Sequence, residues 1–110
     1  MRASACRMGA RYRQPLDVFK TVRLSVEFTT RRDEVIDYAL VLIAELGGRI
    51  ETICVYDSAH GQNEMHRYTQ DLGKQPAEIF HHDTLGEGMR TAIGEIQRGY
   101  EEMIDGWRRG

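Results

Sequence analysis

The sequence lacks most of the features that would assign it a compartment or a chemistry. No apolar run approaches the roughly 20 residues needed to cross a bilayer, and the first residues lack the continuous apolar stretch of a secretory signal. Two cysteines are too few for a disulfide framework or a zinc pattern. There is no phosphate-binding glycine loop, nucleophile elbow or calcium loop. These absences predict a cytoplasmic protein without a membrane segment, and no cofactor is expected.

What is present is typical of one small domain. A chain of 110 residues is too short for two ordinary cores. Its hydrophobic fraction of 41% and charged fraction of 29% are those of globular proteins. Cys54 lies in an apolar segment and is expected to be a small buried hydrophobe. The modest core of such a chain would gain from a second copy, so a homodimer is one expectation.

Positive charge is concentrated at the start of the chain. Residues 1–16 contain four arginines and no acid, which leaves 11 basic against 17 acidic residues, a formal charge of −6, in the remainder. The composition predicts a disordered basic tail over residues 1–16 and a single α+β domain over residues 17–110. The alternative is a basic arm that contacts phosphate.

The first half of the domain predicts a strand and then a helix. A strand is predicted over residues 17–28, because residues 21–28 alternate polar and apolar side chains with the period of a half-buried strand. Residues 31–46 carry apolar side chains at spacings of three and four, which favours a helix, and Gly47-Gly48 would end it.

The second half predicts three short strands and a long helix. Residues 49–57 and 64–69 read as strands, and Pro76 would keep a strand over residues 77–81 at a sheet edge. Thr84 with Glu87 forms a capping-box pattern before an apolar stripe that runs to Trp107. The fold class is therefore α+β, a small, mostly antiparallel sheet in the order β-α-β-β-β-α with a long amphipathic C-terminal helix.

Polar residues of catalytic type gather around one predicted hairpin. If it closes near residues 60–62, Asp57 and His66 lie opposite each other, with His60 in the turn and Arg67 on the return strand. Two imidazoles can exchange protons with RNA at neutral pH, and a guanidinium can stabilise the charge on phosphorus. The substrate-binding candidates are Tyr56, Tyr68 and Lys74. The alternative is that Asp57 and His60 only organise the turn.

Two other interpretations stay open. Asp57, His60 and His66 form a two-histidine, one-carboxylate set that could bind a metal, with one of His81 and His82 able to join. This is the weaker alternative, and the expected site contains no metal. The end of the last helix presents either core residues or partner-binding anchors, which are Tyr100, Met103, Ile104 and Trp107.

The hairpin and the closing helix resemble a known family. The stretch Val55-Tyr56-Asp57-Ser58-Ala59-His60-Gly61, followed by His66-Arg67 and Gly73-Lys74, resembles the TumE-type proteins of bacterial toxin–antitoxin pairs and related uncharacterised actinobacterial proteins. The resemblance covers about residues 49–107. Val55 stands where that pattern usually has an arginine, which removes one phosphate contact.

The resemblance implies a growth-inhibiting toxin with RNA as its substrate and a cognate antitoxin as its partner. Together with the hairpin, it predicts a metal-independent ribonuclease acting through His60, His66 and Arg67, with Asp57 orienting an imidazole. The alternative function is a non-catalytic interaction module, antitoxin-like or phage-derived, that binds a protein through its C-terminal helix.

Overall fold

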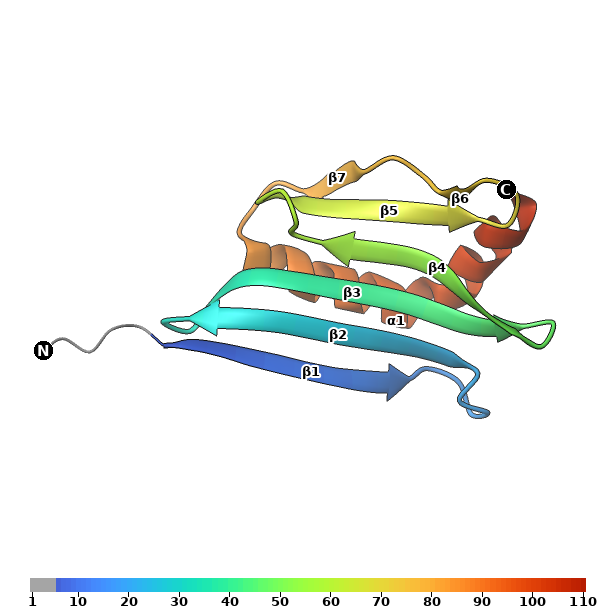
Figure 1. Ribbon diagram of the computed structural model, residues 1–110, viewed down its shortest axis with the longest axis horizontal. Helices are drawn as coiled ribbons and strands as arrows, with labels where there is room; N and C mark the ends of the chain where they lie inside the picture. The colour runs from blue at the N-terminus through green and yellow to red at the C-terminus, as the bar shows by residue number, and fades with distance from the viewer. Residues whose placement is uncertain (1–5) are drawn as a thin grey trace, which may run out of the picture.

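Residues 6–110, which the computed structural model describes, form an antiparallel seven-stranded sheet with one long helix on one face (Figure 1). The strand order is β1-β2-β3-β4-β5-β6, and β7 also pairs with β5. The α+β class, the antiparallel sheet and the C-terminal helix are confirmed. The strands are β1 (Arg7–Pro15), β2 (Val22–Arg31), β3 (Glu34–Leu46), β4 (Arg49–Asp57), β5 (Asn63–Thr69), β6 (Gly73–Lys74) and β7 (Glu78–His81).

The helix α1 (Leu85–Arg109) begins where the capping pattern predicted. The Thr84 side chain accepts a hydrogen bond of 3.2 Å from the backbone N–H of Glu87, which satisfies one of the free donors of the first turn. The helix keeps its stripe against the sheet but has a non-helical residue at Gly99, with φ −128° and ψ 16°. Gly99 therefore marks a kink in the helix.

The helix expected over residues 31–46 is wrong, because this segment is the central strand β3. Its side chains alternate between the helix-covered face, where Tyr38, Leu40 and Leu42 are buried, and a face that is only partly exposed. Apolar side chains on both faces hide the two-residue period and imitate a helical stripe. The predicted order of elements therefore loses its first helix.

Tight turns set the register on both sides of β3. Arg32 and Asp33 both have positive φ, 53° and 64°, as do Gly47 and Gly48, at 59° and 78°. Two successive residues with positive φ are typical of the turns that join antiparallel strands by two residues. Gly47-Gly48 thus closes a hairpin between β3 and β4 instead of ending a helix.

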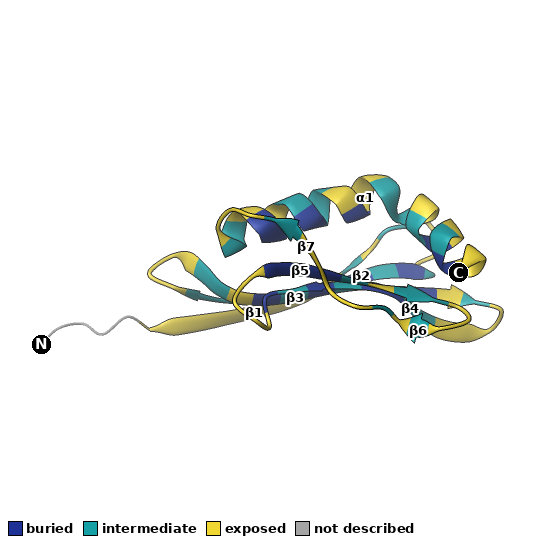
Figure 2. Cartoon of the chain, turned by 90° about the horizontal axis from the view of Figure 1, so that it is seen from above, coloured by how far each residue is buried: buried dark blue, intermediate teal, exposed yellow. Residues whose placement is uncertain are grey.

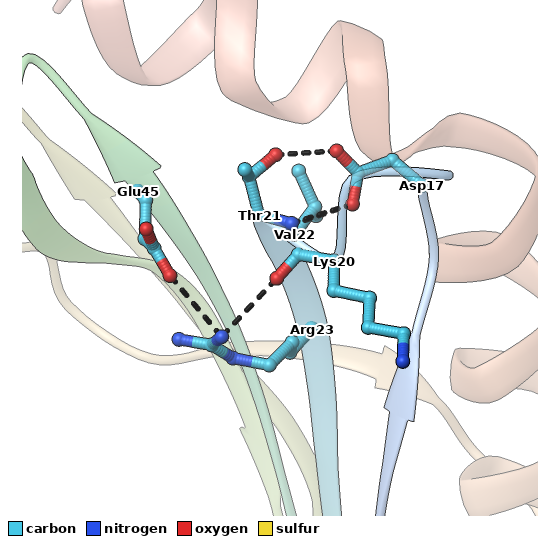
Figure 3. Close-up of polar contacts among 6 residues, drawn as sticks. All are labelled: Asp17, Lys20, Thr21, Val22, Arg23 and Glu45. Atoms are coloured by element: carbon cyan, nitrogen blue, oxygen red, sulfur yellow. Dashed lines mark hydrogen bonds and ion pairs between the residues drawn. The ribbon is translucent and has the colours of Figure 1, made fainter.

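The prediction of a disordered tail is wrong for residues 7–15, which form the edge strand β1 paired along β2; residues 1–5 lie outside the described part. The predicted first strand also shifts, since β2 starts at Val22 and residues 17–21 form the connection. Asp17 holds this connection by accepting hydrogen bonds from the backbone N–H groups of Thr21 and Val22, at 2.7 and 3.0 Å (Figure 3).

The core lies between the sheet and α1, as the buried residues in Figure 2 show. Fully buried side chains from β2 and β3 meet Ala92 and Ile96 of the helix. Within residues 6–110 no element covers the opposite side of the sheet (Figure 2). We call this side the open face. No helix of the described chain is long and apolar enough to cross a membrane.

Candidate functional site

The β4–β5 hairpin places the predicted site residues by its register. Asp57 lies opposite Glu64, and His66 lies opposite Val55. The predicted pairing of Asp57 with His66 is thus wrong by two residues. A shift of two keeps every side chain on its face of the sheet, whereas a shift of one would have reversed it. Asp57 and His66 consequently share the open face.

Three side chains of this hairpin form a close cluster. One ligand-type atom each from Asp57, Glu64 and His66 lies within 4.8 Å of the other two. His60, in the turn, joins them because its Nδ1 lies 2.9 Å from Oε1 of Glu64. We call these four residues the acid–imidazole cluster. It contains three of the four predicted catalytic residues.

Hydrogen bonds orient each member of the cluster. Oδ1 of Asp57 accepts from the backbone N–H of Ala59 at 3.2 Å. Nδ1 of His66 lies 3.0 Å from the carbonyl oxygen of Gln75. Because a carbonyl only accepts, this Nδ1 carries the hydrogen and the free lone pair of the neutral ring is on Nε2. The tautomer of His66 is therefore set by the backbone.

Glu64 changes the protonation of His60. The hydrogen bond that His60 donates to the Glu64 carboxylate, followed by the charge of that carboxylate, raises the pKa of His60 above its usual 6.5. The His60 ring is mostly exposed, whereas the Glu64 side chain is 10% exposed. The pair therefore joins a nearly buried anion to an imidazole that solvent or a substrate can reach.

Arg67 does not join the cluster. It is next to His66 in β5, so its side chain points to the other face of the sheet. There it lies opposite Cys54 and ion-pairs with Glu78 of β7, with Nε and Oε2 3.5 Å apart. The predicted convergence of Arg67 with the two histidines is wrong for this geometric reason.

Of the predicted substrate-binding residues, Tyr56 lies away from the cluster, on the helix-covered face. Tyr56 is 2% exposed, and its ring packs edge-on against Phe80 with centroids 4.9 Å apart. Burial raises the pKa of the Tyr56 hydroxyl. Lys74 of β6 pairs with Tyr68, two residues after His66 in β5. Tyr56 is a core residue and is not available to stack on a base.

A hollow lies between the sheet and the end of α1. Its volume is about 400 Å³, and Tyr56, Arg67, Tyr68, Met103 and Trp107 are among its lining residues. Cys54 also borders it, and burial raises the pKa of that thiol to about 12, which agrees with the predicted role of a small buried hydrophobe. Tyr56 and Arg67 thus lie on the opposite face of the sheet from the acid–imidazole cluster.

The predicted partner-binding residues belong to the core. Ile104 and Trp107 are 8% and 7% exposed, and Tyr100 and Met103 pack against the same core. The Tyr100 hydroxyl donates a hydrogen bond of 3.2 Å to the carbonyl of Leu16. Of the two alternatives left open for this stretch, the structure favours core packing.

Away from the cluster, the open face has arginine side chains along its β1 edge. Arg7, Arg11 and Arg13 alternate along the edge strand β1 on this side, opposite Arg31, Glu27 and Ser25 of β2. A hollow of about 410 Å³, lined among others by Arg11, Asp37 and Ala39, lies over β1 to β3. Ala39 is also the cross-strand neighbour of Asp57. The hollow thus extends from Arg11 of β1 to Ala39, the residue paired with Asp57.

Glu64 is the site residue that the sequence analysis missed. Its position in a short strand of mixed polar residues did not single it out, and its pairing with Asp57 joins two different strands. One signal was available: Glu64 lies two residues before His66, and such residues share a strand face.

The fold and the cluster define a class: a small α+β protein with one helix-covered sheet face and an acid–imidazole cluster on the other. The chain belongs to the family described as a domain of unknown function (DUF7718), whose model matches residues 3–110. Neither the curated proteins nor the solved structures contain a match.

Proposed function

We propose that this protein is a toxin–antitoxin-type ribonuclease that cleaves RNA on the open face of its sheet without a metal. The observation that carries the proposal is the acid–imidazole cluster, in which His66 lies beside Asp57 and Glu64 while His60 is bonded to Glu64. Paired imidazoles with separate orienting partners can provide one proton acceptor and one proton donor.

The hydrogen bonds give the two histidines different roles. His66 donates its Nδ1 hydrogen to the carbonyl of Gln75, so its Nε2 can take the proton of a ribose 2′-hydroxyl. The 2′ oxygen then bonds to phosphorus while the bond from phosphorus to the 5′ oxygen breaks. His60, held through Nδ1 by Glu64, gives its Nε2 proton to the departing 5′ oxygen. The products are a 2′,3′-cyclic phosphate and a 5′-hydroxyl, and water returns the proton from His66 to His60.

The arginines of β1 provide the means to bind the substrate. Arg7 and Arg13 face the same side of the sheet as the cluster, and arginine neutralises phosphate along a nucleic acid. β1 lies three strand spacings from β4, about 14 Å, which two or three nucleotides of a single strand can span. Single-stranded RNA is therefore the substrate that the face fits best.

The toxin–antitoxin context rests on the resemblance of the β4–β5 hairpin to the TumE-type pattern. The alternative, an interaction module that binds through its C-terminal helix, loses its main support because Ile104 and Trp107 are buried in the chain's own core. A cognate antitoxin would have to cover another surface, and the open face is where binding would stop cleavage.

The direct test is cleavage of a fluorescent single-stranded RNA by the purified chain in the presence of EDTA. His66→Gln and His60→Gln are each expected to slow cleavage by about 100-fold or more. His82→Gln makes the same change just beyond β7, outside the cluster, and is the matched control. Arg67→Gln is expected to keep most of the activity, because Arg67 lies on the other face.

Absence of cleavage by the unaltered chain, or equal cleavage by His66→Gln, would refute the proposal. The toxin assignment is tested separately by inducible expression in a bacterium. We expect growth arrest with the unaltered chain and normal growth with His66→Gln at the same protein level. Cleavage in vitro without growth arrest would keep the ribonuclease and reject the toxin.

A further inference from the structure

On the open face, two carboxylates lie side by side, and among the described residues neither forms an ion pair with a lysine or arginine. Asp57 and Glu64 are direct cross-strand partners, and like charges in that arrangement destabilise a sheet. Within residues 6–110, the ion pairs of the structure join Glu64 only to the His60 ring. A bound cation would remove this repulsion.

We propose that Asp57, Glu64 and His66 bind one divalent transition-metal ion of the Mn²⁺ or Zn²⁺ type. Their three ligand-type atoms already lie within 4.8 Å of one another. Metal bonds of about 2.1 Å in tetrahedral geometry place ligand atoms about 3.4 Å apart, so shifts of roughly 1 Å would close the site. Two carboxylates favour Mn²⁺ over softer ions, and the imidazole favours a transition metal over Mg²⁺ or Ca²⁺.

The hydrogen bonds around the cluster resemble those that orient metal ligands. A ligating histidine usually donates its other N–H to a carbonyl or carboxylate, and His66 has this arrangement with Gln75. Oδ1 of Asp57 is occupied by Ala59, and Oε1 of Glu64 is occupied by His60. Among the described residues, each ligand thus has one of its two ligand-type atoms fixed by a hydrogen bond, which leaves the other for an ion.

The site would be accessible and incompletely coordinated. Asp57 and His66 are only partly buried, so an ion can enter from solvent. Three protein ligands leave at least one position for water. The inference does not rest on the proposed function, although both use Nε2 of His66. Since that lone pair cannot both accept a proton and bind an ion, saturating metal should suppress metal-independent RNA cleavage.

The test is calorimetric titration of the full chain, stripped with chelator and freed of it, with MnCl₂ and separately with ZnCl₂. We expect one ion per chain, and a rise in Tm of about 10 °C at an ion concentration 100 times Kd. Asp57→Asn and His66→Gln are each expected to weaken binding at least about 10-fold. Asp37→Asn removes a charge from the same face of β3, and His82→Gln removes an imidazole elsewhere; both should bind normally.

A folding defect cannot imitate this result, because Asp57→Asn removes a like-charge contact and should melt at or above the metal-free unaltered chain. Absence of binding at about 1 mM ion overturns the metal site. So does binding that survives both cluster variants, or that is lost equally in Asp37→Asn. Metal binding without RNA cleavage under any condition refutes only the ribonuclease. Cleavage in EDTA without ion binding refutes only the metal site.

Discussion

Asn63 and Gly88 approach so closely that a Cβ atom added to Gly88 would lie 1.9 Å from Oδ1 of Asn63. Asn63 is the first residue of β5 and is 2% exposed. Its side-chain N–H group donates to the carbonyls of Asp83 and Thr84 at 3.1 and 3.2 Å, just before the helix. This contact fixes the start of β5, and therefore Glu64 and His66, against the N-terminus of α1.

Gly88→Ala is expected to lower the free energy of unfolding by about 1–3 kcal/mol, because the buried amide of Asn63 cannot move without losing its hydrogen bonds. Gly94→Ala is the matched control in the same helix, where the added Cβ would meet only the end of the flexible Arg98 side chain. That variant should gain up to about 1 kcal/mol from helix propensity. Urea denaturation measures both, and equal effects would contradict the packing argument.

Tyr38→Phe removes the hydroxyl that donates a 2.6 Å hydrogen bond to Oδ1 of Asn63. The free energy of unfolding is expected to fall by about 1–3 kcal/mol, because Oδ1 of Asn63 stays buried without the hydroxyl that donates to it. Tyr12→Phe is the control, since Tyr12 is 45% exposed on the edge strand, and should change stability little. A Tyr38→Phe chain as stable as the original would show that this bond contributes nothing net.

Replacing Arg32-Asp33 by Asn-Gly is expected to stabilise the chain by about 1 kcal/mol. Both residues have positive φ, and Asn-Gly adopts this two-residue turn with less strain. A change of the opposite kind in the other turn, Gly47→Ala at φ 59°, should destabilise the chain by a similar amount. Thermal unfolding of the two variants should shift Tm in opposite directions. Shifts of the same sign would be incompatible with the turn assignment.

The connection between β1 and β2 should be sensitive to acid. Hydrogen bonds from the Thr21 side chain and from the Val22 backbone hold the pKa of Asp17 below its usual 3.8 (Figure 3). A lowered folded-state pKa contributes stability that is present above about pH 4 and is lost as the pH falls through the folded-state value. Asp17→Asn and Thr21→Ala should both reduce this acid-dependent component, measured by urea denaturation from pH 7 down to pH 2. An unchanged pH profile in both would contradict the assignment.

Several parts of this protein could be read from local sequence. Thr84 and Glu87 marked the helix start, and the apolar stripe to Trp107 marked its length. The strands around Val55 and His66 also appeared where expected, because β-branched and alternating residues limit the local choice. In β3 the same kind of evidence failed. Val41 and Ile43 place apolar side chains on the open face of this central strand as well. Only its pairing with the neighbouring strands therefore distinguishes β3 from a helix.

The candidate site shows the same division. The sequence placed Asp57 and His66 on one hairpin. Their side chains lie on the same face of the sheet, as predicted, although the predicted register was wrong by two residues. It did not reveal Glu64, whose role depends on its cross-strand partner. It also placed Arg67 with the histidines, although adjacent strand residues must point to opposite faces.

The sequence by itself determined the helix with its cap, the polar hairpin and the charge of each segment, because these depend on residues close together in the chain. Tertiary structure decided which face of the sheet α1 covers, that residues 7–15 complete the sheet as an edge strand, and which acid meets which imidazole. The physical reason is that strand pairing joins residues distant in sequence. A pairing is chosen by the burial it achieves across the whole sheet rather than by local preference.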